Sequence, residues 1–200
     1  MSNKQFSSAS YADSKPHYNI LDGLRGAAAL MVVWYHVFEG FAFAEGMNGV
    51  EGGGLINTFN HGYLAVDFFF MLSGFVISYA YDDRWNKMSL GDFFKRRLVR
   101  LHPMIIMGAI IGLTTFLLQG GVKWDGSVTP VAGVVVAFLL TCCFIPAWPG
   151  AMHEVRGNGE MFPLNGPSWS LFFEYIGNIC YALFIRRLST KALSVLVAVL

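Results

Sequence analysis

The sequence predicts an all-α fold: a polytopic transmembrane helix bundle with five full spans and the start of a sixth. Hydrophobic residues make up 54% of its 200 residues and charged residues only 14%, whereas an average soluble domain is about 25% charged. The mean hydropathy is +0.49. Apolar segments of near-spanning length recur along the chain, and Lys and Arg gather in some of the connections between them. These observations favour a membrane protein with several spans.

The five segments expected to span the membrane are residues 24–41, 63–81, 103–118, 130–147 and 169–185. A sixth apolar segment begins near Ala192 and reaches only nine residues by Leu200, whereas a membrane helix needs about 20. We therefore expect residues 1–19 to be a polar cytoplasmic tail. Residues 20–200 are expected to be the N-terminal part of a membrane domain that is truncated within a helix.

The placement of Lys and Arg predicts the orientation of the chain. Residues 1–19 and the connection 82–102 are basic, whereas the connection 39–62 has no Lys or Arg. The positive-inside rule therefore places the tail and the second connection in the cytoplasm. Strict alternation would then put the basic residues of 186–191 outside, against the same rule. Either 130–149 is re-entrant, or that cluster is tolerated outside because the first spans dominate the orientation.

The remaining composition narrows the function classes. A net charge of +1 gives no reason to expect nucleic-acid binding. The three cysteines, Cys142, Cys143 and Cys180, lie in apolar runs without metal-ligand or CxxC spacing, so we expect core residues and no metal site.

Arg25 and His36 stand eleven residues apart in the first apolar segment. On a helix both side chains share one face, about 16.5 Å apart along the axis. Ionisable groups inside a membrane helix are costly and are functional candidates. The functional interpretation is that Arg25 holds an anion while a neutral His36 accepts a proton as a general base. The alternatives are a snorkelling anchor for Arg25 and a packing role for His36. Glu39 is either a residue that orients His36 or a solvated helix end.

A second group of cations lies in the run FFKRRLVRLHP. On a helix Arg97 and Arg100 share a face at i, i+3, and guanidinium groups suit phosphate oxygens. They are expected either to clamp the phosphates of a soluble cytoplasmic donor or to bind anionic lipid headgroups at the membrane surface.

A carboxylate enters the last full apolar segment, in WSLFFEYIGNICY. Ser170, Glu174 and Asn178 follow one another at intervals of four residues and form a polar stripe on a helix. A buried carboxylate needs a partner, and we expect a cation or an imidazole from another span.

These motifs together resemble acyltransferase family 3 of integral membrane proteins, over about residues 19–187. The matching segments are LDGLRGAAALMVVWYH with Arg25 and His36, VDFFFMLSGF, RLVRLHP with Arg97 and Arg100, and WSLFFE ending at Glu174. The resemblance implies transfer of an acyl group, usually acetyl from cytoplasmic acetyl-CoA, to a hydroxyl of a carbohydrate or other extracytoplasmic acceptor. It also suggests a bacterial plasma membrane. The chain departs from the family pattern at His102, where an aromatic residue is common.

From this resemblance we expect His36, Arg25 and Glu174 to act in catalysis, and Arg97, Arg100 and Arg25 to bind the donor. His36 would either deprotonate the acceptor hydroxyl or carry the acyl group itself. The expected partners are acyl-CoA, a carbohydrate or small-molecule acceptor and membrane lipids, with no nucleic acid and no permanently bound cofactor. The rival interpretation is a non-catalytic membrane protein: a transporter of a glycan or lipid intermediate, or an inactive truncated relative.

Overall fold

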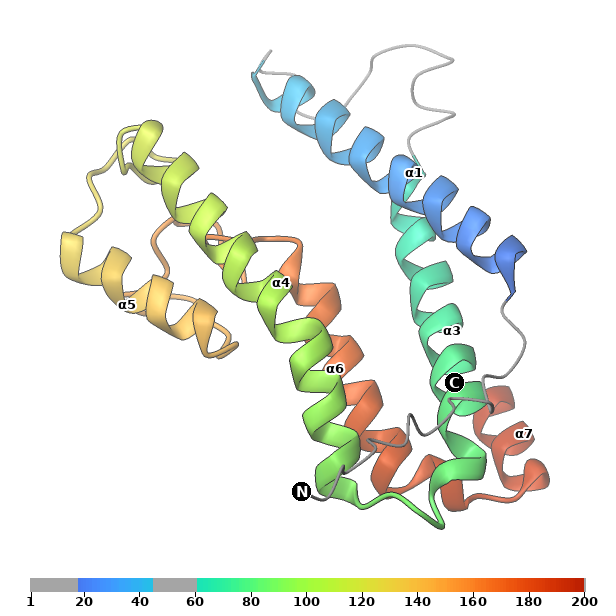
Figure 1. The fold of residues 1–200 in the computed structure, drawn as a ribbon. Coiled ribbons are helices and arrows are strands. Elements are labelled where there is room, and N and C mark those ends of the chain that lie inside the picture. Colours follow the sequence, from blue (N-terminus) through green and yellow to red (C-terminus); the bar gives the residue numbers. More distant parts are fainter. Residues whose placement is uncertain (1–17, 45–60, 200) are drawn as a thin grey trace, which may run out of the picture. The chain divides into compact units, whose positions relative to one another are not determined.

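The computed structural model describes residues 18–44 and 61–199, and of residues 38–44 it describes the backbone alone. The helices are α1 (Asn19–Ala44), α3 (Gly62–Tyr81), α4 (Leu90–Leu118), α5 (Val131–Cys142), α6 (Ser168–Leu183) and α7 (Thr190–Val199), with the 3₁₀ turns η1 (Asp82–Arg84) and η2 (Ile185–Arg187) (Figure 1). No β-strand occurs among the described residues, so the all-α prediction is confirmed for them. The chain forms two compact units, and the second begins at Tyr81.

The first unit is an antiparallel pair of helices, α1 and α3. Tyr18, just before α1, contacts the rings of Phe75 and Tyr79 near the end of α3. At the other end, Gly62 begins α3 so close to α1 that a Cβ there would stand 2.3 Å from the Cβ of Tyr35. Only glycine permits this approach, which is how small residues bring membrane helices together.

The second unit is built on α4 and α6, which run antiparallel. Along α4 the contacts move from Phe93 to Arg97 to Gly112, and their partners run backwards along the chain from Tyr181 to Glu174 to Leu164. A Cβ on Gly112 would lie 1.5 Å from the carbonyl oxygen of Leu164. This close approach fixes the register of the two helices.

The start of α4 differs from the sequence prediction. A capping box, in which Ser89 and Asp92 satisfy each other's backbone N–H groups, begins the helix at Leu90, well before the predicted boundary at residue 103. Pro103 lies inside the helix instead of starting it. Lys95, Arg96, Arg97 and Arg100 therefore all lie on α4.

The segment containing α5 leaves one end of α4 and returns to it. Phe116, near the end of α4, packs with Val134 of α5 and with Val155 beyond it. Between these two points the chain reaches Phe144, whose ring contacts Tyr175 on α6 at 5.3 Å between centroids. The return is fixed by a hydrogen bond of 3.0 Å from the Thr129 hydroxyl to the Val155 carbonyl. Residues 130–155 thus leave and rejoin the same end of α4, and the re-entrant alternative for residues 130–149 stays a prediction.

The lengths of the helices bear on the number of spans. In the described part of the chain, three helical segments are long and apolar enough to cross a membrane: Asn19–Val37, Gly62–Arg84 and Leu90–Leu118. The helices α5, α6 and α7 have 12, 16 and 10 residues, fewer than the roughly 20 that a span needs. The expected count of five full spans plus a sixth is not confirmed.

The course of α6 determines where the basic residues after it lie. Strict alternation of the predicted spans placed residues 186–191 outside, against the positive-inside rule. Because α6 returns to the end of α4 that carries Leu90, Arg186 lies there too, with its guanidinium 4.0 Å from the centroid of the Trp85 ring. The two basic clusters of the second unit, in 84–100 and 186–187, therefore lie at the same end. Such clustering fits the positive-inside rule for these two clusters.

The C-terminal end of α5 is a strained turn. Phe144 adopts φ 59°, a left-handed conformation, and is the one non-glycine residue with positive φ in the described part of the chain. Its N–H donates to the Thr141 carbonyl and the next N–H, of Ile145, donates to that of Leu140. This is a Schellman motif, in which glycine is the usual residue.

We expect Phe144→Gly to be more stable than Phe144→Ala by about 1 kcal/mol, because both variants lose the ring but only alanine keeps the left-handed strain. Thermal unfolding of the detergent-solubilised protein measures the difference. At Leu139, which is helical and exposed, the matched pair should show the opposite order, since glycine is the poorer helix former. An alanine variant at 144 as stable as the glycine variant would contradict the strained turn.

Candidate functional site

A buried ion pair joins α4 to α6. Nη2 of Arg97 lies 2.8 Å from Oε1 of Glu174, and Arg97 is only 4% exposed. The expectation that Glu174 finds a cation on another apolar helix is confirmed for the second unit. The capping box at Ser89 sets the phase of α4 so that Phe93 and Arg97, four residues apart, both face α6.

Further polar groups beside this ion pair have unused hydrogen-bonding capacity. Nε of Arg97, the hydroxyl of Tyr175 and both side-chain polar atoms of Asn178 are buried without a hydrogen-bond partner among the described residues. Tyr175 follows Glu174 directly, and Asn178 lies one turn further along the same helix. Buried polar groups are almost always satisfied in folded proteins. Such a concentration is therefore a candidate functional site.

Aromatic side chains flank the ion pair on both sides along α6. Towards the Leu90 end, Trp85 packs on Phe93 and donates a hydrogen bond from Nε1 to the Tyr181 hydroxyl at 3.2 Å. That hydroxyl in turn donates to Asp82. On the opposite side, the ring of Phe144 stacks on that of Phe162 and contacts that of Tyr175. Rings on both sides limit water access and so strengthen the electrostatic interaction between Arg97 and Glu174.

Arg97 and Arg100 have different environments, although sequence spacing places them on one broad face. Arg97 is buried and its charge is matched by Glu174, whereas Arg100 is exposed. Of the two, Arg100 is thus the one available to an anion from solution. The prediction that both arginines bind the donor stays a prediction, and the structure makes Arg100 the stronger candidate.

In the first unit, α1 runs continuously through Arg25 and His36, as the spacing argument required. Nη1 of Arg25 lies 3.8 Å from Oδ1 of Asp22, and the Arg25 side chain is 37% exposed. His36 is exposed and its ring meets that of Tyr35 edge-on, at 5.4 Å between centroids. The proposed role of Glu39 concerns a side chain outside the described residues.

Asp22 is the residue that sequence reasoning missed. Its signal was the i, i+3 spacing to Arg25 within LDGLRG, which on a helix brings a carboxylate beside a guanidinium. The contact is long and solvent-exposed, so its contribution to stability is small. It nevertheless gives Arg25 a partner that restricts where its guanidinium lies.

The described residues contain no group of three or more His, Cys, Asp or Glu that could hold a metal ion. The expectation that all three cysteines are core residues is only partly met. Cys142 and Cys180 are half-buried, whereas Cys143 is exposed because it caps the end of α5.

Apolar helices of membrane-spanning length, with ionisable side chains placed along them, define an integral membrane protein. The sequence profile of the acyltransferase domain matches residues 18–200. The chain therefore belongs to this family, acyltransferase family 3, and its reaction class is the transfer of acyl groups other than aminoacyl groups.

Three relatives illustrate the similarity. Protein 2 in the picA locus of Rhizobium radiobacter is 30% identical over 191 residues, covering 90% of this chain and 88% of the relative. Acyltransferase MdmB of Streptomyces mycarofaciens is 31% identical over 83% of this chain and 38% of its own length. Peptidoglycan O-acetyltransferase OatA of Listeria monocytogenes is 30% identical over 49% of this chain and 14% of its own length. No solved structure matches the chain significantly.

We expect Glu174→Gln to destabilise the protein by about 3–5 kcal/mol, because it leaves the Arg97 charge buried and uncompensated. Thermal unfolding in detergent measures the loss. Glu160→Gln is the matched control, since Glu160 accepts its hydrogen bond from the exposed side chain of Asn158. Adding Arg97→Met to Glu174→Gln should restore most of the stability. Equal unfolding temperatures for the two single variants would contradict the energetic role of the ion pair.

Proposed function

We propose that this protein is a membrane O-acyltransferase that moves an acyl group, in the simplest case acetyl, from cytoplasmic acyl-CoA to a hydroxyl group outside the cytoplasm. Family membership supports O-acyl transfer. The acceptor in this proposal is a carbohydrate or small molecule of the cell envelope, and the membrane is the plasma membrane of a bacterium. The relative named as a peptidoglycan O-acetyltransferase supports that choice.

The observation that carries the donor assignment is the clustering of cations at the Leu90 end of the second unit. Arg100 and Arg187 are exposed there, and Arg186 is held over Trp85. Acyl-CoA carries several phosphates, and planar guanidinium groups suit them because they donate two parallel hydrogen bonds. In this proposal the Leu90 end faces the cytoplasm and Arg100 is the principal contact to the donor. A role of Arg25 in donor binding stays a prediction of its own.

Arg97 and Glu174 take a different part in the proposal from the one the motif first suggested. A phosphate that bound Arg97 would have to displace Glu174 or share the guanidinium with it. We assign the pair instead to positioning: it holds α4 against α6 and so fixes where Arg100 points. Arg97 is then a positioning residue, and Nε is its one remaining buried donor.

His36 is assigned to proton transfer. A neutral imidazole would accept the proton of the acceptor hydroxyl while that oxygen attacks the thioester carbonyl, and CoA would leave as the thiolate. Alternatively, the imidazole nitrogen attacks the thioester first and expels CoA as the thiolate, which leaves an acyl-imidazole. The acceptor hydroxyl then takes the acyl group, and its proton and the free imidazole are released. The second route moves the acyl group across the membrane without moving CoA. Trapping an acylated His36 would distinguish the two.

We expect His36→Ala to lower acyl transfer at least about 100-fold, because a positioned general base contributes roughly that much or more. Incorporation of labelled acetyl from acetyl-CoA into envelope material by membranes containing the protein measures the rate. His61→Ala is the control, since His61 is also exposed and also contacts a tyrosine ring edge-on. Turnover by a normally inserted His36→Ala protein would overturn the assignment.

We expect Arg100→Gln to weaken acyl-CoA binding about tenfold, because a charge-assisted hydrogen bond contributes about 1.5–3 kcal/mol. A titration of detergent-solubilised protein with acetyl-CoA gives the affinity. Lys123→Gln removes a positive charge from the opposite end of α4 and should leave the affinity unchanged. An unaltered affinity in the Arg100 variant would leave this arginine as a lipid anchor.

A further inference from the structure

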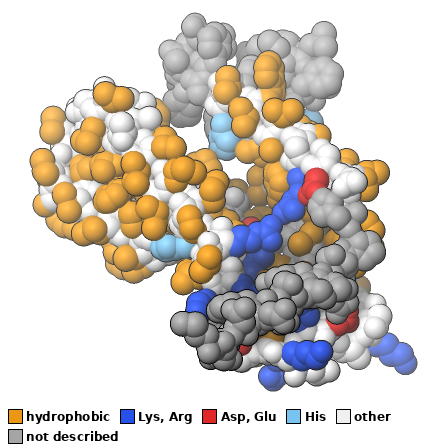
Figure 2. All heavy atoms as spheres, viewed as in Figure 1, with side chains coloured by type: hydrophobic (Ala, Val, Ile, Leu, Met, Phe, Trp, Pro, Cys, Tyr) orange, Lys and Arg blue, Asp and Glu red, His pale blue; other side chains and the backbone are white. Residues whose placement is uncertain are grey.

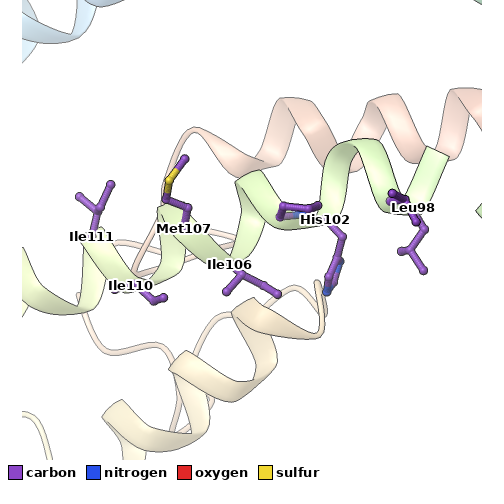
Figure 3. Close-up of a pocket in the computed structure, with 8 residues that line it drawn as sticks. Leu98, His102, Ile106, Met107, Ile110 and Ile111 are labelled. Carbon is purple, nitrogen blue, oxygen red and sulfur yellow. The ribbon is translucent and has the colours of Figure 1, made fainter. Parts of the chain in front are cut away.

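A second face of α4, turned away from α6, carries an apolar groove. It has a volume of about 590 Å³ and is lined by eight residues between Leu98 and Ile111, of which His102 is the one polar side chain (Figure 3). Figure 2 shows hydrophobic side chains over the exposed surfaces of α4 and α5. Val99, Met107 and Ile110 of this groove are each at least half exposed. Arg97 lies on the other face, so α4 separates a charged contact from an apolar one.

The groove is long enough to hold a lipid chain. Its thirteen steps from Leu98 to Ile111 correspond to about 20 Å along the axis, more than the roughly 15 Å depth of one leaflet. Val99 and Pro103 both line the groove, and Pro103 has no N–H to donate to the Val99 carbonyl.

The length of α4 places the start of the groove at the membrane surface. Its 29 residues extend about 43 Å, roughly 13 Å more than the hydrocarbon core. With Leu118 at one boundary of the core, the other boundary falls near Leu98. The groove then lies within the hydrocarbon, and the residues before Leu98 lie among the headgroups. Arg100, only about 3 Å inside the boundary, reaches the surface by snorkelling.

Two cations stand at that boundary, on the same face as the groove. Lys95 and Arg96 precede Val99 by four and three residues, so they share its face one turn nearer the start of the helix. Both are exposed. His102 follows Lys95 by about 10 Å along the axis, and its ring projects from α4 towards α5 (Figure 3). Along α4 the two cations, the imidazole and the apolar groove thus follow in the same order as the phosphate, the ester and the acyl chain of a phospholipid.

We propose that α4 carries a binding site for an anionic phospholipid. The phosphate lies between Lys95 and Arg96, an ester carbonyl accepts a hydrogen bond from His102, and one acyl chain occupies the groove from Leu98 to Ile111. Charge complementarity selects the anionic headgroup, since cations near a membrane surface attract anionic lipids. The site is distinct from the ion pair with Glu174, and the inference does not depend on acyl transfer.

Native mass spectrometry of the whole protein, relipidated with equal amounts of phosphatidylglycerol and phosphatidylcholine, tests the site. We expect phosphatidylglycerol to be retained at least fivefold over phosphatidylcholine. The double variant Lys95→Gln/Arg96→Gln should lower its retention to the level of phosphatidylcholine. The control Arg84→Gln/Lys87→Gln removes two exposed charges from the same end but off α4, and should retain phosphatidylglycerol as the wild type does. Ile106→Trp, which fills the groove without altering charge, should lower retention of both lipids.

Several results would overturn the proposal. Equal retention of the two lipids by the wild type would show an apolar surface without headgroup recognition. Equal losses in the two double variants would show general attraction to a basic end, and displacement of phosphatidylglycerol by excess soluble CoA would assign the cations to the donor. Unfolding temperatures in lipid-free detergent identify variants that fail to fold. If Lys95→Gln/Arg96→Gln fails to fold, the lipid retention of Ile106→Trp and the competition with CoA decide whether the lipid site exists.

Discussion

The contact between Arg97 and Glu174 is the interaction on which the second unit depends. A buried guanidinium is costly without a partner, and the partly buried carboxylate of Glu174 is the group that neutralises it, so α4 and α6 must meet in the register that brings the two groups to 2.8 Å. The same register sets Phe93 against Tyr181, and it sets Gly112 against the backbone of Leu164. A slip of one turn would separate Arg97 from Glu174, and a slip that brought Phe116 to the place of Gly112 would drive its side chain into the backbone of Leu164. Electrostatics and close packing therefore specify the same arrangement.

The sequence predicted the type of this contact but not its members. Glu174 stood in an apolar helix and required a cation, yet any of several basic residues in 84–100 satisfied that requirement. The choice depends on the register of two helices whose residues are 77 positions apart, and hydropathy carries no information on register. The shared face of Arg25 and His36 is easier to predict, because both residues lie on one continuous helix. Asp22 is harder to single out, because an acidic residue in the first turn of a helix is already explained by the helix dipole.

The expected spans failed where local backbone conformation overrode composition. Residues 130–147 are apolar enough to suggest a crossing, but the Schellman turn at Phe144 ends α5 after 12 residues. Without a glycine to mark it, that turn has no signal in a hydropathy pattern. The start of α4 shows the same effect. By hydropathy alone, the charged residues before Pro103 indicate a connection between helices, whereas Ser89 and Asp92 form a capping box that begins the helix at Leu90. In both cases a capping motif, not hydrophobicity, decided the boundary.

Pro103 divides α4 into two arms with different attachments. The arm beyond it is held by the close approach of Gly112 to Leu164 and by the core around Phe116. The arm before it carries Arg97 and the exposed cations. A helix that lacks one backbone hydrogen bond bends more readily at that point, so each arm of α4 needs attachments of its own. For the basic arm these are the ion pair of Arg97 with Glu174 and the contact of Phe93 with Tyr181. The direction in which the exposed cations project is therefore decided by contacts made across to α6.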